Sequence, residues 1–343
     1  MVPGSLEDQP VRTWIRTLPK IELHLHLEGS VGPDLLETLA RKNRVDLPLG
    51  PSGSAENFYR FRDFPGFLDC FRRVCQVLRS PEDLVLVAEN LFAELIRQKV
   101  IYAEIFLSPV IYPTLGWSVR EAMPAIHAAA LAAEKRSGLV CRFLFDSVRQ
   151  WGRKAMEDTA ALAEECRCWG VAGIGLGGQE DSVPARDFED IFDWASGRQL
   201  LAAVHAGETG GPENVREALQ YLHPRRIGHG LGAAADPALL EELKQKGILV
   251  DVCLTSNLRT GVWTDLPSHP VHRFYQAGVP FSLNTDDPGI FGTSLGREIA
   301  LAADLLSLDL PAVQKIMRRS AEAAFLPPDQ KSALLSMTGV GPG

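Results

Sequence analysis

The sequence predicts an eight-stranded TIM-type α/β barrel, (β/α)8, with a helical lid inserted after the first strand. Eight short apolar runs recur along the chain, and their Val, Ile, Leu and Ala content is typical of strands buried on both faces of a parallel sheet. Helical patterns separate these runs, which indicates repeated strand–helix units. Several runs end in His, Glu or Asp, and the carboxyl ends of barrel strands carry the chemistry of this fold. We expect strands within 21–29, 100–109, 140–149, 170–178, 200–208, 225–230, 248–257 and 281–288.

Composition and charge restrict the kind of protein. A chain of 343 residues with 45% hydrophobic and 23% charged residues is typical of a globular protein with a large core. The net charge of −8 disfavours nucleic-acid binding. No apolar run approaches the ~18 residues of a membrane span, and no signal peptide is evident. The six cysteines form no C-x-x-C pair, which indicates buried free thiols in a reducing compartment. We therefore expect a cytoplasmic protein.

The helical patterns define one domain over residues 13–336, with flexible ends at 1–12 and 337–343. The wide gap between the first two strands contains Pro33, which suits a first helical position, and Ser80, which suits a helix N-cap.

A stretch between these two helix starts is rich in aromatic residues, and we expect a lid at about 32–80, over the barrel mouth. The alternative is that its phenylalanines are ordinary core residues. These residues are Phe58, Phe61, Phe64, Phe67 and Phe71.

The chain contains a metal-type set of residues. His24 and His26 lie two apart on the first strand, so their imidazoles face the same side. An isolated H-x-H pair is usually packed or solvated, but His205 and Asp286 also lie at strand ends. Three imidazoles and a carboxylate suit Zn²⁺ with a position open for water, whose pKa bound zinc lowers to about 7. The fourth strand offers no bridging ligand, and Glu180 follows it on a loop, so we expect one Zn²⁺ per chain.

Three further residues suit acid–base chemistry at the same strand ends. Glu208 follows His205 by three residues, His229 lies between glycines, and Asp287 directly follows Asp286. Addition of water to an electron-poor carbon needs a base and an acid. Each residue also has a structural alternative: a helix-start carboxylate, a buried histidine, and a cap before Pro288. Their joint placement at strand ends favours the catalytic interpretation.

Several segments together resemble the adenosine deaminase family of the metal-dependent amidohydrolases. The likeness extends over residues 18–328. It implies a (β/α)8 barrel with one zinc ion and hydrolytic loss of ammonia from C6 of a 6-aminopurine, a cleavage of a C–N bond in a cyclic amidine. The segments are LPKIELHLHLEGS, GIGLGGQE, HAGE, RIGHG, CLTSN and SLNTDDP.

The resemblance also implies roles for individual residues. Glu208 is similar to the family's proton donor to purine N1, and His229 is similar to the base that orients and deprotonates the zinc-bound water. Asp287 is similar to the partner of purine N7, and the Gly178 N–H to the partner of N3. The implied zinc ligands are His24, His26, His205 and Asp286, and the implied apolar gate is Phe67, Leu68 and Phe71. The H-x-E and P-C-x-x-C signature of nucleic-acid deaminases is absent.

Substrate choice rests on the residues at the purine's 5′ side. Members acting on adenosine often carry Asp where this chain has Glu28, and the segments 145–152 and 211–215 resemble the aminodeoxyfutalosine deaminases of the alternative menaquinone route. Their substrate is an adenosine whose 5′ carbon carries a chain ending in a benzoate. Arg149 and Arg259 are candidates to bind that carboxylate, with structural ion pairs as the alternative. We expect such a 5′-extended adenosine as substrate, with adenosine or adenine as alternatives.

Two other function classes fit less well. A phosphoesterase that also begins with H-x-H needs ligands for two or three metal ions, and two or more tightly bound ions per chain would favour it. A nucleoside-binding barrel without turnover would bind nucleosides tightly and release no ammonia. The expected partner is a small purine nucleoside, with no nucleic acid and no membrane, and the oligomeric state is left open.

Overall fold

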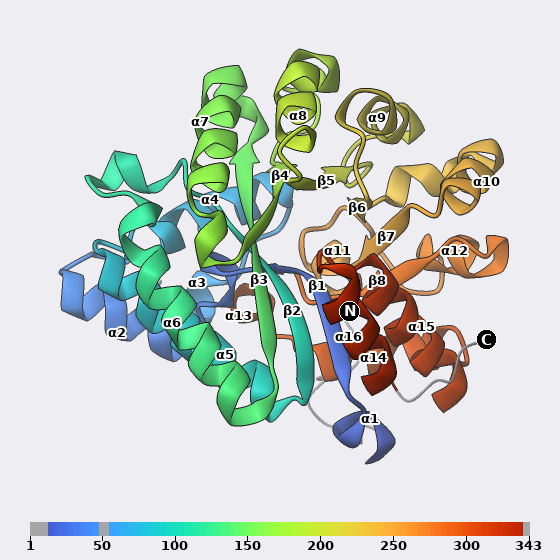
Figure 1. The fold of residues 1–343 in the computed structure, drawn as a ribbon, viewed down its shortest axis with the longest axis horizontal. Coiled ribbons are helices and arrows are strands. Elements are labelled where there is room, and N and C mark those ends of the chain that lie inside the picture. Colours follow the sequence, from blue (N-terminus) through green and yellow to red (C-terminus); the bar gives the residue numbers. More distant parts are fainter. Residues whose placement is uncertain (1–12, 48–54, 339–343) are drawn as a thin grey trace.

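The computed structural model describes residues 13–47 and 55–338. Eight strands pair in parallel in the order of the chain, from β1 to β8. A bridge between Leu25 and Asp286 joins the first strand to the segment after the last. The predicted barrel is confirmed (Figure 1). The strands are β1 Lys20–His26, β2 Val100–Leu107, β3 Val140–Val148, β4 Val171–Gly177, β5 Leu201–Ala206, β6 Arg226–His229, β7 Leu249–Val252 and β8 Phe281–Leu283.

Helices surround the sheet. The helices before β2 are α1 Thr13–Thr17, α2 Pro33–Asn43, α3 Ala55–Phe58, α4 Phe64–Cys75 and α5 Pro81–Arg97. Between β2 and β8 lie α6 Val119–Ser137, α7 Gly152–Glu165, α8 Glu189–Ser196, α9 Pro212–Glu217, α10 Pro237–Lys246, α11 Leu254–Arg259 and α12 Val271–Ala277. After β8 come α13 Pro288–Phe291, α14 Leu295–Leu305, α15 Leu310–Ala323 and α16 Pro328–Met337. Shorter turns are η1 Glu28–Ser30, η2 Tyr112–Leu115, η3 Arg149–Trp151, η4 Arg167–Trp169, η5 Ala185–Phe188, η6 Ala218–Leu222 and η7 Leu231–Ala235.

Two strand expectations are too long. β7 ends at Val252, and the polar residues that follow begin α11 instead. The reason is a helix start: the Glu298 carboxylate accepts a hydrogen bond from the Thr255 N–H at 3.2 Å, which satisfies a donor that the helix leaves free. β8 is only three residues long, and the chain then turns inward at Asp286.

In its described part, the segment between β1 and β2 forms four α-helices. α2 begins at Pro33, and α5 begins with a capping box of Ser80 and Asp83, so both predicted starts are confirmed. α4 begins at a capping aspartate, Asp63, which accepts a hydrogen bond from the Gly66 N–H at 2.9 Å. α4 lies in the segment that was predicted as a lid. The lid stays a prediction, and residues 48–54 lie outside the described residues.

The aromatic residues of this segment serve packing as well as the cavity described below. Phe58 and Phe67 are buried, and Phe67 contacts Phe291 of α13 at 5.2 Å between ring centroids. Phe61, Phe64 and Phe71 are partly buried against the same core. These rings therefore pack in the core, as the alternative interpretation expects; Phe64, Phe67 and Phe71 also line the cavity, and the lid stays a prediction.

The core contains charged groups. Arg226 on β6 is fully buried, where its guanidinium contacts the Glu104 carboxylate at 2.6 Å and the Asp251 carboxylate at 3.1 Å. The same guanidinium lies 4.1 Å above the ring of Phe325. These contacts tie β2, β6 and β7 together inside the sheet.

Other expectations concern the surface and the ends. All six cysteines are free and five are buried, while Cys168 is exposed. No helix among residues 13–47 and 55–338 has the length and apolar character needed to cross a membrane. The flexible ends were expected at 1–12 and 337–343; of these, residues 1–12 and 339–343 lie outside the described residues, whereas Met337 belongs to the final helix.

Candidate active site

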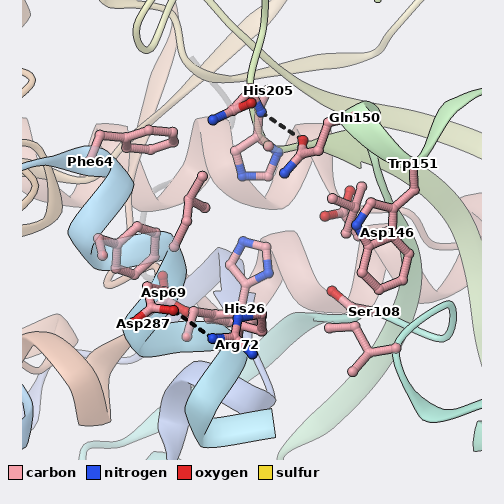
Figure 2. A pocket seen from close by; sticks show the side chains of 18 of the residues that line it. His26, Phe64, Asp69, Arg72, Ser108, Asp146, Gln150, Trp151, His205 and Asp287 are labelled. Carbon is pink, nitrogen blue, oxygen red and sulfur yellow. Dashed lines mark hydrogen bonds and ion pairs between the residues drawn. The ribbon is translucent and has the colours of Figure 1, made fainter. Parts of the chain in front are cut away.

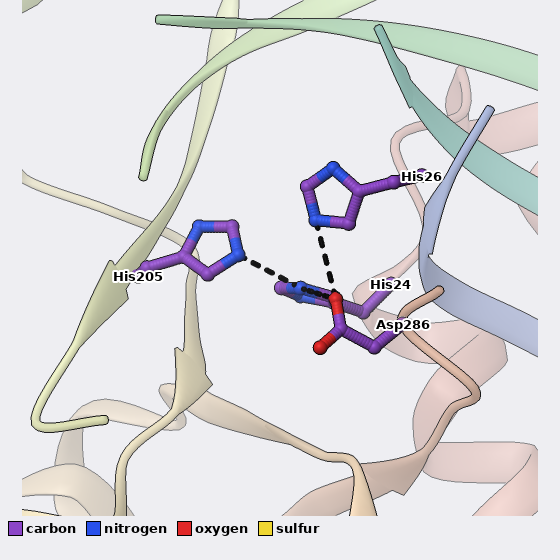
Figure 3. A group of neighbouring side chains, drawn as sticks. All are labelled: His24, His26, His205 and Asp286. Carbon is purple, nitrogen blue, oxygen red and sulfur yellow. Dashed lines mark hydrogen bonds and ion pairs between the residues drawn. The ribbon is translucent and has the colours of Figure 1, made fainter. Parts of the chain in front are cut away.

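Four side chains from three parts of the barrel converge at one point (Figure 3). Their potential ligand atoms all lie within 4.8 Å of one another. The Nε2 atoms of His24 and His205 are 3.0 Å apart, and the His26 Nε2 atom lies 3.3 Å from Asp286 Oδ1. The pair on β1 faces one side as strand alternation predicts, and His205 and Asp286 come from the ends of β5 and β8. The structure thus brings together all four residues of the predicted metal set.

Protonation in this cluster suits a cation. Burial lowers the pKa of His26 to about 3 and that of His205 well below its ordinary value, so both imidazoles are neutral. Burial opposes ionisation of Asp286, but its hydrogen bond with His24 and the nearby imidazoles hold its pKa well below the ordinary value. Neutral imidazoles and an ionised carboxylate are the forms that bind metal.

His24 is the exception in this cluster. Burial lowers its pKa, but hydrogen bonds with Asp251 and Asp286 outweigh that effect and raise the pKa to about 9. Asp251 Oδ2 lies 3.6 Å from His24 Nδ1, and Ser256 Oγ donates to Asp286 Oδ2 at 2.6 Å. A metal ion held by these residues would replace a proton of His24, and the contacts with Asp251 and Ser256 would orient the ligands.

A second potential group overlaps the first. His229, Cys253 and Asp286 also lie within 4.8 Å of one another. Burial raises the pKa of Cys253 well above its ordinary value, so its thiol is protonated and a poor ligand. The donor chemistry therefore favours the site of His24, His26, His205 and Asp286.

The predicted acid–base residues lie beside this cluster. Burial raises the pKa of Glu208 well above its ordinary value, and the charges of Asp286 and Glu180 raise it further, so Glu208 carries a proton. Its Oε1 atom is 3.6 Å from His229 Nε2. Burial also raises the pKa of Asp287, whose Oδ1 atom has no hydrogen-bond partner among the described residues.

A chain of hydrogen bonds sets the form of His229. The Val271 N–H donates to His269 Nδ1 at 3.1 Å, which leaves the His269 proton on Nε2, facing Asn257 Oδ1 at 3.1 Å. The Asn257 amide then donates to His229 Nδ1 at 3.1 Å. Neutral His229 therefore carries its proton on Nε2, which faces the cavity. For Nε2 to accept a proton, the His229 proton has to move to Nδ1, and Asn257 has to turn its amide so that its oxygen accepts from Nδ1. The base role stays a prediction.

One cavity of about 740 Å³ contains most of the predicted residues. In Figure 2 Phe64 of α4 lies on one side, and Asp146 and Trp151 lie on the other. Sequence reasoning did not assign Asp146 in β3, Ser108 after β2 or Gln150 in η3 to the site, although it singled out the segment 145–152, which contains two of them, as a family resemblance. The predicted residues that line it are His26, Phe67, Leu68, Phe71, Gly178, His205, Glu208, His229, Asp286 and Asp287.

Three predicted substrate residues are not among the described residues that line this cavity. Glu28 Oε1 accepts hydrogen bonds from the Ser108 N–H at 2.9 Å and the Tyr112 hydroxyl at 2.5 Å. Arg149 donates to the Val183 carbonyl at 3.0 Å, and Arg259 donates to the Tyr59 carbonyl at 2.9 Å. Both arginines are thus bonded to backbone carbonyls, and their role in binding the substrate stays a prediction.

Other cations line the cavity instead. Leu68 and Arg72 on α4 and Gln76 at its C-terminus are spaced four residues apart. Arg79 lies beyond the end of the helix. Arg72 is paired with Asp69 at 2.6 Å, whereas the Arg79 guanidinium has no partner among the described residues. The spacing of Leu68, Arg72 and Gln76 is a sequence signal that could have identified this face.

Comparison with known proteins agrees with this geometry. A family model described as adenosine deaminase matches residues 19–339. An aminodeoxyfutalosine deaminase of Streptomyces avermitilis is 40% identical over 92% of this chain and 89% of its own length. An adenine deaminase of Sinorhizobium medicae is 35% identical over 93% of this chain and 98% of its own. The crystal structure of an adenine deaminase from Arthrobacter aurescens has a TM-score of 0.86 at 26% identity, covering 94% of this chain and 98% of its own.

Proposed function

Because this chain belongs to the adenosine deaminase family and is a hydrolase of C–N bonds, we propose that it deaminates a purine nucleoside whose 5′ end carries an anionic extension. The observation that carries the chemistry is the meeting, in one cavity, of the four-residue metal-type cluster and the protonated Glu208. We assign the cavity to a small molecule, and the reaction to hydrolytic loss of ammonia from C6.

The metal-binding residues of the proposal are His24, His26, His205 and Asp286, and one Zn²⁺ fits their number and type. The family is metal-dependent. When bound, the ion supplies Lewis acidity and lowers the pKa of water.

The remaining residues have separate roles at the purine ring. Glu208 donates its proton to a ring nitrogen, N1, as water adds at C6 and makes that nitrogen more basic. His229 orients the water through Nε2, and Asp287 and the Gly178 N–H hold N7 and N3. Phe67, Leu68 and Phe71 cover the ring and exclude bulk water, which strengthens each polar contact.

Two observations support the 5′-extended substrate over adenosine or adenine. Relatives named aminodeoxyfutalosine deaminase reach 40% identity, against 35% for those named adenine deaminase. The cavity also extends from the metal-type cluster to Arg72 and Arg79, where an anion is favoured. Such a substrate, aminodeoxyfutalosine, places the reaction in the alternative menaquinone route.

The test is ammonia release by the zinc-loaded protein from aminodeoxyfutalosine, adenosine and adenine at equal concentrations. We expect kcat/KM for aminodeoxyfutalosine to be the highest. A preference for adenosine or adenine contradicts the substrate but keeps the chemistry. Absence of ammonia release from all three, with tight nucleoside binding, contradicts the enzymatic proposal.

A further inference from the structure

Glu180 receives an unusual number of backbone hydrogen bonds. It follows β4 on a loop, is 4% exposed, and its carboxylate faces the segment just after β5. Its Oε2 atom accepts from the Gly207 N–H at 2.7 Å. Its Oε1 atom accepts from the N–H groups of Glu208 at 2.7 Å and Thr209 at 2.8 Å, with a longer contact of 3.4 Å from Gly210. One side chain therefore holds the backbone on both sides of Glu208.

The charge of this buried carboxylate is compensated locally. Successive backbone N–H groups form a concave anion-binding surface. Arg149 supplies a cation: burial lowers its pKa, and the charge of Glu180 is the largest of the carboxylate effects that oppose this. Arg149 is itself buried and donates a hydrogen bond to the Val183 carbonyl, so its positive charge acts on Glu180 inside the protein. Both Glu180 oxygens accept backbone hydrogen bonds, so the N–H groups of residues 207–209 surround the carboxylate.

The segment held in this way has little freedom. Gly207 has a φ of 70°, which favours glycine, and its carbonyl accepts from the Gly232 N–H at 2.7 Å. A Cβ atom at Gly207 would lie 2.6 Å from the Val215 side chain. With its N–H bonded to Glu180, Glu208 directs its side chain toward His229.

We propose that Glu180 is a positioning residue for the reaction, which fixes the backbone of residues 207–210 and thereby aims the proton donor Glu208 at the substrate. This inference rests on the proposed function, because it assigns Glu208 as the donor. No substrate contact is required of Glu180: among the described residues, it is not one that lines the cavity.

The first test is Glu180→Gln, which keeps the shape but replaces one accepting oxygen by a donor. We expect kcat to fall by about ten- to a hundred-fold, as misplacement of a catalytic group by a fraction of an ångström does, with KM and bound zinc unchanged. Asp236→Asn is the control, since Asp236 also accepts two backbone N–H groups, those of Ala238 and Leu239, and is not among the described residues that line the cavity. It should lower thermal stability and leave kcat unchanged. A raised KM with normal kcat for Glu180→Gln overturns the proposal.

The second test is a double-mutant cycle with Glu208→Gln. If Glu180 acts through Glu208, adding Glu180→Gln to the Glu208→Gln variant should change the residual kcat less than twofold. A loss as large as in the wild-type background overturns the proposal, because the two effects are then independent.

A third test needs no turnover. Amide hydrogen exchange of residues 207–210 should be faster in zinc-loaded Glu180→Gln than in the wild type, with strand β5 unchanged. Unchanged exchange at these amides overturns the positioning role. If the wild type releases no ammonia from any nucleoside, the proposed function fails, while this measurement still decides whether Glu180 holds the segment.

Discussion

His229 and Asp286 combine functional placement with strained backbone. Both are non-glycine residues with a positive φ, 61° and 66°. Such conformations cost on the order of 1–3 kcal/mol each and persist where the surroundings enforce them. Here Asp286 is bonded to the backbone of β1 on both sides, through His26 N–H to Asp286 O at 2.8 Å and Asp286 N–H to His24 O at 3.1 Å. The strained backbone directs both side chains into the cavity, and this strain lowers the free energy of unfolding.

Replacement of Glu208 tests the proton donor directly. Glu208→Gln preserves size and should keep purine and zinc binding, but we expect kcat to fall by about 10²–10⁴-fold because the amide is no acid. Steady-state ammonia release and calorimetric binding of a purine nucleoside measure the two effects. Glu213→Gln, an exposed change on α9, is the control and should have no effect. A near-normal kcat for Glu208→Gln would contradict the assignment of Glu208 as the proton donor.

Removal of one imidazole tests the metal cluster. We expect His24→Ala to weaken zinc binding by more than the ~10–100-fold that loss of an outer-sphere contact costs, because a ligand is removed. Metal analysis after dialysis against a chelator checks this, and His127→Ala on α6, away from the cluster, is the control. Retention of a full zinc complement by His24→Ala contradicts the assignment.

At the scale of elements, α4 decides what the cavity offers at its rim. The helix brings an aromatic face and Arg72 to the opening, and the loop after it brings Arg79. Arg72 is neutralised by Asp69, so Arg79 supplies the uncompensated charge.

Arg79→Ala tests whether that charge reads the 5′ extension. We expect KM for aminodeoxyfutalosine to rise about tenfold, the loss of one charge-assisted hydrogen bond, with KM for adenosine unchanged. Arg73→Ala is the matched control, because Arg73 lies on α4, pairs with Asp69 and is not among the described residues that line the cavity. Equal changes for both nucleosides would remove Arg79 from substrate selection.

Sequence reasoning succeeded where local rules decide position. Strand alternation places His24 and His26 on one face, and fully apolar runs predict buried parallel strands. It did not anticipate the partners of Arg149 and Arg259, because their side chains donate to carbonyls that only folding brings close. The directions of Arg79 and Asn257 likewise depend on how α4 and α11 pack, which no local pattern encodes.

At the scale of the molecule, a buried ion network stabilises the barrel. Arg226→Met leaves the buried Glu104 and Asp251 without their cation, and we expect the free energy of unfolding to fall by about 3–5 kcal/mol. Urea unfolding measures this change. Arg153→Ala, which breaks an exposed pair with Asp190, should cost under about 1 kcal/mol. Equal costs for the two variants would contradict a special role for the network.

The closure of the barrel between β1 and Asp286 has a consequence for biosynthesis. The metal-type cluster joins residues from the first strand with a carboxylate from beyond the last. A nascent chain that ends before Asp286 offers imidazoles without their carboxylate partner and without the seam that aligns them. The four-residue cluster is therefore completed only after β8 has been synthesised and the segment beyond it has closed against β1, so a cation bound there would report closure of the barrel.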